Sequence, residues 1–231
     1  MELRANLSNE YLLYNALSYG GQKEEVIANY LLTEAEFLNL LNNTDQRKFL
    51  LDQLPPDMKG SLLHLFLNHK YNITESPLWH YTILNYKQPV RAVHAETDFW
   101  VLNRAINLKS LHQVRLLQKR ILEITNHELR VNVLCLGAKA VVGLPELGKN
   151  LSICCIESDE NMLNELKAIY ANEPGIRKYV KGDFQHYCPD RKYGVIVYPS
   201  GKTWQETEKM QDLLLKLKNY LNPDKGRVLA Y

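Results

Sequence analysis

One glycine and two acidic residues are placed where a nucleoside could be bound. Gly137, Glu157 and Asp183 each follow a short apolar segment that is rich in β-forming residues. A glycine lets a ligand approach the backbone closely. An acid about 20 residues further along can accept hydrogen bonds from both hydroxyls of a ribose. A second acid after the next segment can accept one from an adenine amino group, so the pattern is typical of an adenosine site.

The neighbours of these residues indicate how such a site would be completed. Phe184 follows Asp183 and can pack on a purine, and Tyr198 ends the fourth apolar segment, where a reacting group would sit. Each position also has a structural alternative: the segment Glu157-Ser158-Asp159 can begin a helix, Asp183 can occupy a turn, and Tyr198 can be core packing. No partner suited to general base catalysis stands out, so the catalytic residue is left unassigned.

These residues need elements that bring them to one edge of a sheet. Strands are predicted at residues 131–136, 151–156, 176–180, 194–198 and 227–231, and helices at 159–170 and 203–221. Apolar strands that alternate with amphipathic helices predict a parallel sheet covered on both faces. In open sheets of this kind, ligands bind at the carboxyl ends of the strands.

The amino-terminal part shows no strand-like alternation. Helices are predicted from a cap at Ser8, a capping box at Thr33, and the segments 45–54, 62–67 and 98–125. The basic residues of the last helix suit either a solvated face or a substrate or partner surface. We therefore expect an all-helical domain over residues 1–97, followed by an α/β domain over residues 98–231.

The composition narrows the classes of partner. The chain has 231 residues, of which 28 are basic and 26 acidic, and a formal net charge of +2. That balance gives no electrostatic attraction to nucleic acid or to an anionic membrane. No apolar run approaches the roughly 20 residues of a membrane helix, and no signal peptide is recognised, so a cytoplasmic protein is expected. The four cysteines form no C-x-x-C pair, so reduced cysteines and no metal site are expected.

With these residues in view, the segment 98–231 resembles the class I S-adenosylmethionine-dependent methyltransferases. The resemblance implies an α/β fold with a Rossmann-like, mostly parallel sheet of about five strands in the order 3-2-1-4-5. It also implies S-adenosylmethionine as cofactor, with the first loop around its methionine end. The set of cofactor-binding residues carried over is Gly137, Ala138, Lys139, Glu157, Ser158, Met162, Asp183, Phe184 and Tyr198.

Within that set, the resemblance assigns Glu157 to the ribose, and Asp183 and Met162 to the adenine. Added helical parts in this family cover the site or mediate dimerisation, so a homodimer is one expectation that the sequence leaves open. The first loop departs from the family pattern. Cys135 replaces the usual acid, and Lys139 and Val141 stand where glycines are usual. Lys139 brings a positive charge towards a sulfonium, or it pairs with the carboxylate of the cofactor.

A second departure is that the sequence stops just after the fifth predicted strand, where the family sheet ordinarily has two more. Either the chain given is truncated, or the sheet is short and its edge is covered by something else. The leading hypothesis is methyl transfer from S-adenosylmethionine to a small molecule. Transfer of another group from the same cofactor is a related option, and a non-catalytic binding or dimerisation module is the alternative from another class.

Two other interpretations of the ligand-binding residues fit the sequence less well. Residues 143–150 read almost as a phosphate-binding loop, but they run into a predicted strand instead of a helix. A nicotinamide cofactor would share the acid after the second strand, but the G-x-G-x-x-G pattern is missing.

Overall fold

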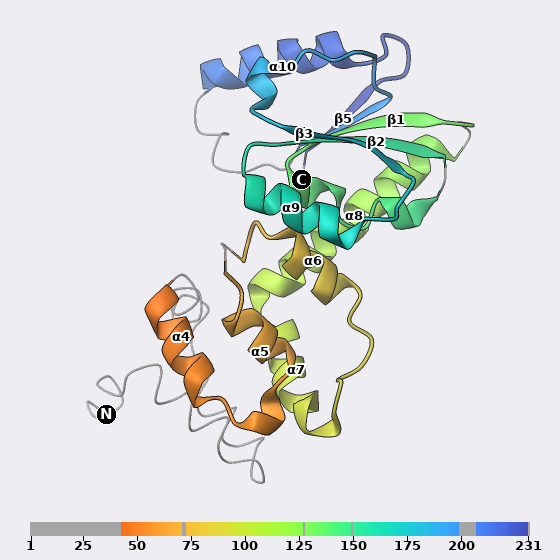
Figure 1. Ribbon diagram of the computed structural model, residues 1–231. Coiled ribbons are helices and arrows are strands. Elements are labelled where there is room, and N and C mark those ends of the chain that lie inside the picture. The colour runs from red at the N-terminus through yellow and green to blue at the C-terminus, as the bar shows by residue number, and fades with distance from the viewer. Residues whose placement is uncertain (1–42, 71–72, 127, 149, 199–206, 231) are drawn as a thin grey trace. The chain divides into compact units, whose positions relative to one another are not determined.

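A computed structural model describes residues 43–70, 73–126, 128–148, 150–198 and 207–230 (Figure 1). The helices predicted from Ser8 and Thr33 lie outside these residues. The chain divides into two compact units. One comprises Met1–Thr74 and Asn85–Lys109, and the other Glu75–Leu84 and Ser110–Tyr231. This division differs from the boundary between residues 97 and 98 that the sequence predicts, because a short segment from the amino-terminal part belongs to the second unit.

The second unit is built on a sheet of five parallel strands. These are β1 (Val131–Leu136), β2 (Leu151–Glu157), β3 (Ile176–Lys181), β4 (Val195–Tyr198) and β5 (Arg227–Ala230). All four pairings are parallel, and the order across the sheet is β3-β2-β1-β4-β5. The predicted fold class, strand positions and strand order are confirmed. Strands β2 and β3 are added on one side of β1, and β4 and β5 on the other, so the strand order reverses between β1 and β4. Such a reversal defines the switch point where ligands bind in sheets of this kind.

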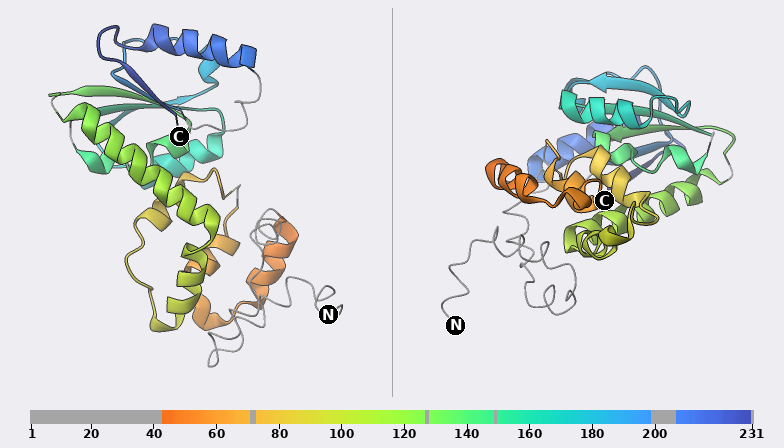
Figure 2. Two further views of the ribbon diagram at one scale, coloured as in Figure 1. Left: turned by 180° about the vertical axis from the view of Figure 1, so that it is seen from behind. Right: turned by 60° about the horizontal axis from the view of Figure 1, so that its bottom comes forward.

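Helices cover both faces of this sheet, as Figures 1 and 2 show. Helix α10 (Thr207–Tyr220) lies on one face, and α9 (Glu160–Ile169), α6 (Pro77–Leu84) and the later turns of α8 (Ala105–Thr125) lie on the other. Since both faces of the three central strands are covered, β1, β2 and β4 are apolar along almost their whole length. On the α10 side, Leu134 and Ile196 pack with Leu213 and Leu217.

Among its described residues, the connection from β1 to β2 contains no α-helix. It consists of two 3₁₀ turns, η4 (Ala138–Val141) and η5 (Pro145–Leu147). Parallel strands are usually joined by a crossover helix, so this short connection leaves part of the sheet face to be covered by other segments. Helix α6 packs against both η4 and α9. A segment that precedes the sheet by some fifty residues in sequence thus covers the place of the absent crossover helix.

Helix α6 is attached to α9 through its first residues. The hydroxyl of Ser76 accepts a hydrogen bond from the backbone N–H of Trp79 and donates one to Glu165 Oε2 at 2.7 Å. The same carboxylate oxygen accepts a hydrogen bond from the backbone N–H of Leu78 at 3.3 Å. A side-chain cap followed by proline at the first helical position is a common start for a helix. Ser76 and Pro77 therefore set where α6 begins, and Glu165 sets where it docks.

The described residues of the first unit form helices, namely α4 (Thr44–Gln53), η2 (Pro56–Met58), α5 (Leu62–Leu67), η3 (Ala92–His94), α7 (Ala95–Leu102) and the first turn of α8. The buried carboxylate of Asp98 accepts hydrogen bonds from the Leu62 N–H at 2.6 Å and from the Tyr86 hydroxyl at 2.9 Å. It therefore ties α7 to the start of α5. Among the described residues, no helix combines the length and apolar character needed to cross a membrane.

The single helix predicted over residues 98–125 is wrong in one respect: the structure has two helices there, α7 and α8. The break is at Asn103, whose side-chain Nδ2 donates to the carbonyl oxygen of Phe99 at 2.8 Å. The side chain of Asn107 donates to the carbonyl of Val101 at 2.7 Å. Asparagine side chains compete with the backbone for such carbonyls and favour helix ends, which the apolar periodicity alone did not reveal.

Candidate functional site

The carboxyl ends of the parallel strands bring most of the predicted residues to one edge of the sheet. Gly137 follows β1, Glu157 ends β2, and Tyr198 ends β4. The register places Leu136 beside Ile156, and Glu157 beside Lys181 at the end of β3. The strand ends are therefore level, and side chains that follow neighbouring strands lie next to one another at this edge.

Gly137 makes the turn that leaves β1. Its φ of 104° and ψ of 141° lie in a region that residues with a Cβ rarely adopt. Its N–H donates to the carbonyl of Ile156 at 2.8 Å, which holds the turn against β2. The chain then enters η4, in which Ala138, Ala140 and Val141 are 0% exposed. The first loop is therefore fixed by packing on its inner side, and Gly137 is required by backbone geometry whatever the loop binds.

Glu157 joins the first loop to the start of α9. Its Oε2 accepts a hydrogen bond from the N–H of Ala138 at 2.8 Å, and its Oε1 accepts one from the N–H of Asp159 at 2.9 Å. The Ser158 hydroxyl lies 3.5 Å from Oε1. The cap of α9 is Asp159, which accepts from the Asn161 N–H, so the segment Glu157-Ser158-Asp159 does begin a helix as predicted, with Asp159 as its cap. Each carboxylate oxygen has two lone pairs, so Oε2 can still accept a ligand hydroxyl, and Oε1 can do so where the ligand displaces the long contact with the Ser158 hydroxyl.

Asp183 and its neighbours lie on the α10 side of the sheet edge. The exposed Asp183 caps η6 (Phe184–His186) by accepting a hydrogen bond from the Gln185 N–H at 2.8 Å. Phe184 is half-buried and packs edge-to-face on Tyr198, with ring centroids 6.5 Å apart. Tyr198 is buried in the core under α10. The structural roles predicted as alternatives for Asp183 and Tyr198 are thus present, and the Asp183 carboxylate remains open to solvent.

The buried side of the loop carries no charge at position 135. Cys135 is 0% exposed, and burial raises the pKa of its thiol, so the side chain is neutral. Its Sγ lies 3.7 Å from the carbonyl oxygen of Ala140, beneath η4. Met162 is also buried, in α9 on the opposite face from Tyr198. Lys139 is partly exposed on the loop.

An ion pair lies beside the predicted ribose residue. Lys181 Nζ, at the end of β3, is 2.5 Å from Glu160 Oε2 in the first turn of α9. The hydrogen bond from Lys181 lowers the pKa of Glu160. Both side chains are exposed, so the pair connects β3 to α9 at the surface without closing the edge of the sheet.

The residues that hold the inner side of the first loop could not be identified from the sequence. Gly143, with a φ of +81°, donates its N–H to the Tyr170 hydroxyl at 3.0 Å and accepts at its carbonyl from Gln118 Nε2 at 2.7 Å. Burial raises the pKa of Tyr170, whose hydroxyl stays protonated and donates to Glu146 at 3.1 Å. These partners come from α8 and from the end of α9, so no local pattern could have identified them.

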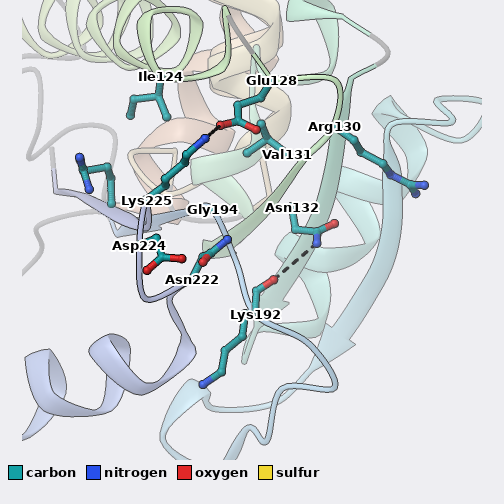
Figure 3. A pocket seen from close by; sticks show the side chains of 11 residues that line it. Ile124, Glu128, Arg130, Val131, Asn132, Lys192, Gly194, Asn222, Asp224 and Lys225 are labelled. Carbon is teal, nitrogen blue, oxygen red and sulfur yellow. Dashed lines mark hydrogen bonds and ion pairs between the residues drawn. The ribbon is translucent and has the colours of Figure 1, made fainter.

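A pocket of about 450 Å³ lies at the opposite, amino-terminal edge of the sheet (Figure 3). It is formed by the starts of β1, β4 and β5 and the loops before them. Lys225 and Glu128 form an ion pair of 3.1 Å in it, while the side chains of Arg130 and Lys192 extend away from that pair. None of the predicted cofactor residues lines this pocket. Among the described residues, no three His, Cys, Asp or Glu side chains are grouped as a metal site.

No protein-family model matches the chain, and no curated protein matches it either. Solved structures that resemble it include the glycopeptide N-methyltransferase MtfA, with 20% identity, a TM-score of 0.41, and coverage of 52% of this chain and 51% of that chain. The N-methyltransferase NodS from Bradyrhizobium japonicum WM9 has 14% identity, a TM-score of 0.41, and coverage of 48% and 64%. DesVI from Streptomyces venezuelae has 17% identity, a TM-score of 0.42, and coverage of 58% and 54%.

The chain thus spans between half and two thirds of the length of these proteins. The assignment of the fold rests on what the sheet itself shows, which is five parallel strands in the order β3-β2-β1-β4-β5 with helices on both faces. By that order and direction, the second unit has a doubly wound, Rossmann-like α/β fold.

Proposed function

We propose that the carboxyl edge of β1, β2 and β3 binds S-adenosylmethionine, and that the protein transfers its methyl group to a small molecule. The observation that carries the proposal is the position of Glu157. Its carboxylate ends the middle one of these three strands and is bonded to the first loop through Ala138 at 2.8 Å. Gly137 follows the strand on one side, and Asp183 follows the strand on the other.

The spacing of these groups suits an adenosine laid across the strand ends. Neighbouring strands are about 4.8 Å apart, so β3 and β1 are separated by about 10 Å. Adenine near Asp183 and ribose near Glu157 direct the 5′ substituent to the loop that begins at Gly137. The order of the groups along the ligand then matches the order of the strands in the sheet.

The residues present can hold each part of such a ligand. Oε2 of Glu157 retains acceptor capacity for one ribose hydroxyl, and Oε1 gains it for the other if the 3.5 Å contact with the Ser158 hydroxyl is displaced. The exposed carboxylate of Asp183 can accept a hydrogen bond from an adenine amino group. The missing side chain of Gly137 leaves room for the 5′ end to approach the backbone. When bound, S-adenosylmethionine would supply an electrophilic methyl group, and the protein would bind and orient it.

The near-neutral charge of the chain is the support for a small acceptor, since nucleic acid and acidic surfaces are bound by basic proteins. No general base is assigned to the acceptor. Alignment of two bound reactants alone contributes substantially to a transfer rate, so these residues need only hold both molecules in position. Whether a general base is needed depends on the acceptor.

A second candidate function is a methyltransferase-like module that binds no cofactor. The observation in its favour is the burial of the first loop. Ala138, Ala140 and Val141 are 0% exposed, and Glu157 already accepts hydrogen bonds from two backbone N–H groups. Packing and these hydrogen bonds are enough to explain the conformation of the loop without a bound cofactor. Direct binding measurements separate the two candidates.

The test is titration calorimetry of the full chain with S-adenosylmethionine. Variants Glu157→Gln and Asp183→Asn keep side-chain size and remove one carboxylate each. Asp190→Asn, an exposed acid in the connection that leads to β4, is the matched control. Loss of a charged hydrogen bond of about 1.5–3 kcal/mol weakens binding by roughly 10- to 100-fold. We expect micromolar binding that is weakened in both site variants and unchanged in the control. Absence of binding at millimolar cofactor supports the second candidate.

A further inference from the structure

Helix α6 belongs to the second unit, although the sequence places it within the first. Residues 75–84 are part of the sheet unit, while the segments on either side, Met1–Thr74 and Asn85–Lys109, are part of the other. The chain therefore leaves the first unit, forms α6 and returns. A change in the first unit can reach both ends of α6 through the chain itself.

The amino-terminal end of α6 is held by one buried polar contact. Ser76 is 0% exposed, and its hydroxyl donates to Glu165 Oε2 of α9 at 2.7 Å. Trp79 and Ile83 are each 3% exposed, so the helix also buries apolar side chains. Release of α6 from α9 would break the Ser76 hydrogen bond and expose these side chains together, which makes docked and released helix two distinct states.

The carboxyl-terminal half of α6 supports the segment that follows the first loop. A Cβ at Gly143 would lie 3.0 Å from Leu84 Cδ2, so the helix lies directly against this backbone. Tyr81 packs edge-to-face on Tyr170, with ring centroids 5.6 Å apart. The Tyr170 hydroxyl in turn accepts a hydrogen bond from the Gly143 N–H at 3.0 Å. Helix α6 therefore holds Gly143 by direct contact and through the tyrosine that accepts its N–H.

The same support continues from Gly143 to the proposed ribose residue. The Leu144 N–H donates to the carbonyl of Val141 at 3.0 Å, so Gly143 lies in a turn that closes on η4. At the other end of η4, the Ala138 N–H donates to Glu157 Oε2 at 2.8 Å. Displacement of Gly143 would therefore shift η4 and the N–H group that holds this carboxylate.

We infer that docking of α6 controls the affinity of the proposed S-adenosylmethionine site. The inference rests on the proposed function, in which the first loop and Glu157 hold the ligand. Released α6 leaves the loop without the support of Leu84 and Tyr81. A ligand that binds the docked arrangement more tightly favours docking, and docking favours the ligand by the same factor. Ser76 is then a positioning residue, which acts on the ligand through α6 and the loop.

The consequence is a route by which the first unit regulates the second. Segments of the first unit flank α6 on both sides in the sequence. A molecule that binds the first unit and displaces these segments releases α6 and weakens ligand binding. A molecule that holds them in place strengthens it.

Hydrogen exchange of single backbone amides, measured by NMR on the full chain, tests the link between α6 and the loop. Ser76→Ala removes the hydroxyl that caps and anchors α6. Ser61→Ala is the matched control, because Ser61 is also 0% exposed and accepts from the His64 N–H at the start of α5. Loss of a helix cap changes an equilibrium by about fivefold to tenfold. We expect the His80 and Gly143 N–H groups to exchange about tenfold faster in Ser76→Ala, and at the wild-type rate in Ser61→Ala.

Addition of S-adenosylmethionine gives a readout that a merely structural role of α6 would not change. It is measured in Ser76→Ala, in which release of α6 dominates the exchange of its amides. If only the docked form binds, exchange in α6 slows by about 100-fold at a ligand concentration of 100 times Kd. Exchange of the Leu65 N–H, which is bonded to the Ser61 carbonyl in α5, is expected to stay the same.

The outcomes separate the inference from the proposed function. Ligand binding without slower exchange in α6 would overturn the control by α6 and leave the proposed function in place. Equal exchange of the Gly143 N–H in Ser76→Ala and wild type would do the same, and this comparison needs no ligand. Failure of S-adenosylmethionine to bind the wild type would overturn the proposed function and the inference with it.

Discussion

Replacement of Gly143 by alanine gives the sharpest test of how the first loop is held. Gly143 lies between η4 and η5, and both of its backbone groups are bonded, to Tyr170 and to Gln118. A Cβ at this position would lie 2.8 Å from Gln118 Nε2, 3.0 Å from Leu84 Cδ2 and 3.0 Å from Val114 Cγ1. The added methyl group therefore meets side chains of α6 and α8 at once.

Two unfavourable effects set the size of the change. A residue with a Cβ held at positive φ costs about 1–2 kcal/mol, and an extra methyl group in a packed core costs about 1–3 kcal/mol. We expect Gly143→Ala to lower the free energy of unfolding by about 2–5 kcal/mol. Since a whole domain is stable by only about 5–15 kcal/mol, the variant should unfold at a clearly lower urea concentration.

Urea denaturation, followed by circular dichroism and by tryptophan fluorescence, measures this change. Trp79 is buried in α6 and so reports on the segment that contacts the loop. Gly60→Ala is the control, because Gly60 has a φ of +92° and open space around its missing side chain. Gly60→Ala therefore has the energetic cost of a Cβ at positive φ, but its methyl group meets no neighbouring side chain. Equal destabilisation by the two substitutions would refute the crowding argument.

A double substitution separates contact from strain. Leu84→Ala removes one of the groups that the new methyl would meet, so Gly143→Ala should be less harmful in that background. Interaction energies of about 0.5–3 kcal/mol are usual for residues in contact. Strict additivity would mean that Leu84 does not confine the loop.

Two further predictions concern single hydrogen bonds. Tyr170→Phe leaves the buried Gly143 N–H without its acceptor and should lower the free energy of unfolding by about 1–3 kcal/mol, measured by urea denaturation. The control is Tyr179→Phe, which changes a half-buried tyrosine of β3. Equal stability of the two variants would contradict this role of Tyr170. The pKa of Glu160 is lowered by Lys181, so this pair stabilises the fold above the unfolded-state pKa of the acid, and the contribution is lost as pH falls through the lower folded-state value. Carbon-13 NMR titration should show the pKa of Glu160 rising towards its ordinary value in Lys181→Met, and no change would argue that the contact is absent in solution.

The sequence predicted the sheet well because its information is local. Each strand is a short apolar run, and each helix between strands repeats its apolar residues at helical spacing. The strand order followed from the resemblance, which rests on Gly137 and on the acids after β2 and β3. The prediction of a single helix over residues 98–125 was wrong at one point. Asn103 ends α7 through a side-chain hydrogen bond, which the spacing of apolar residues does not reveal.

The local signal for α6 was also present, since Ser76 and Pro77 form a recognisable helix start. Its place in the structure was not predictable, because that place depends on Glu165 of α9, far along the chain. The same holds for the division of the chain. Residues 75–84 belong to the α/β unit through packing on η4 and α9, and no change in composition marks them.

By itself, the sequence determined the elements of this protein, the parallel sheet, and the residue types that follow each strand. The tertiary structure decided what those residues touch. It showed that Glu157 holds the first loop through Ala138 and that Asp183 caps a turn. It also showed that Gly143 is confined by side chains of α6 and α8 and by Tyr170, just after α9. The physical reason is that strands and helices form from preferences of neighbouring residues, whereas a site forms from contacts between segments that only the packed fold brings together.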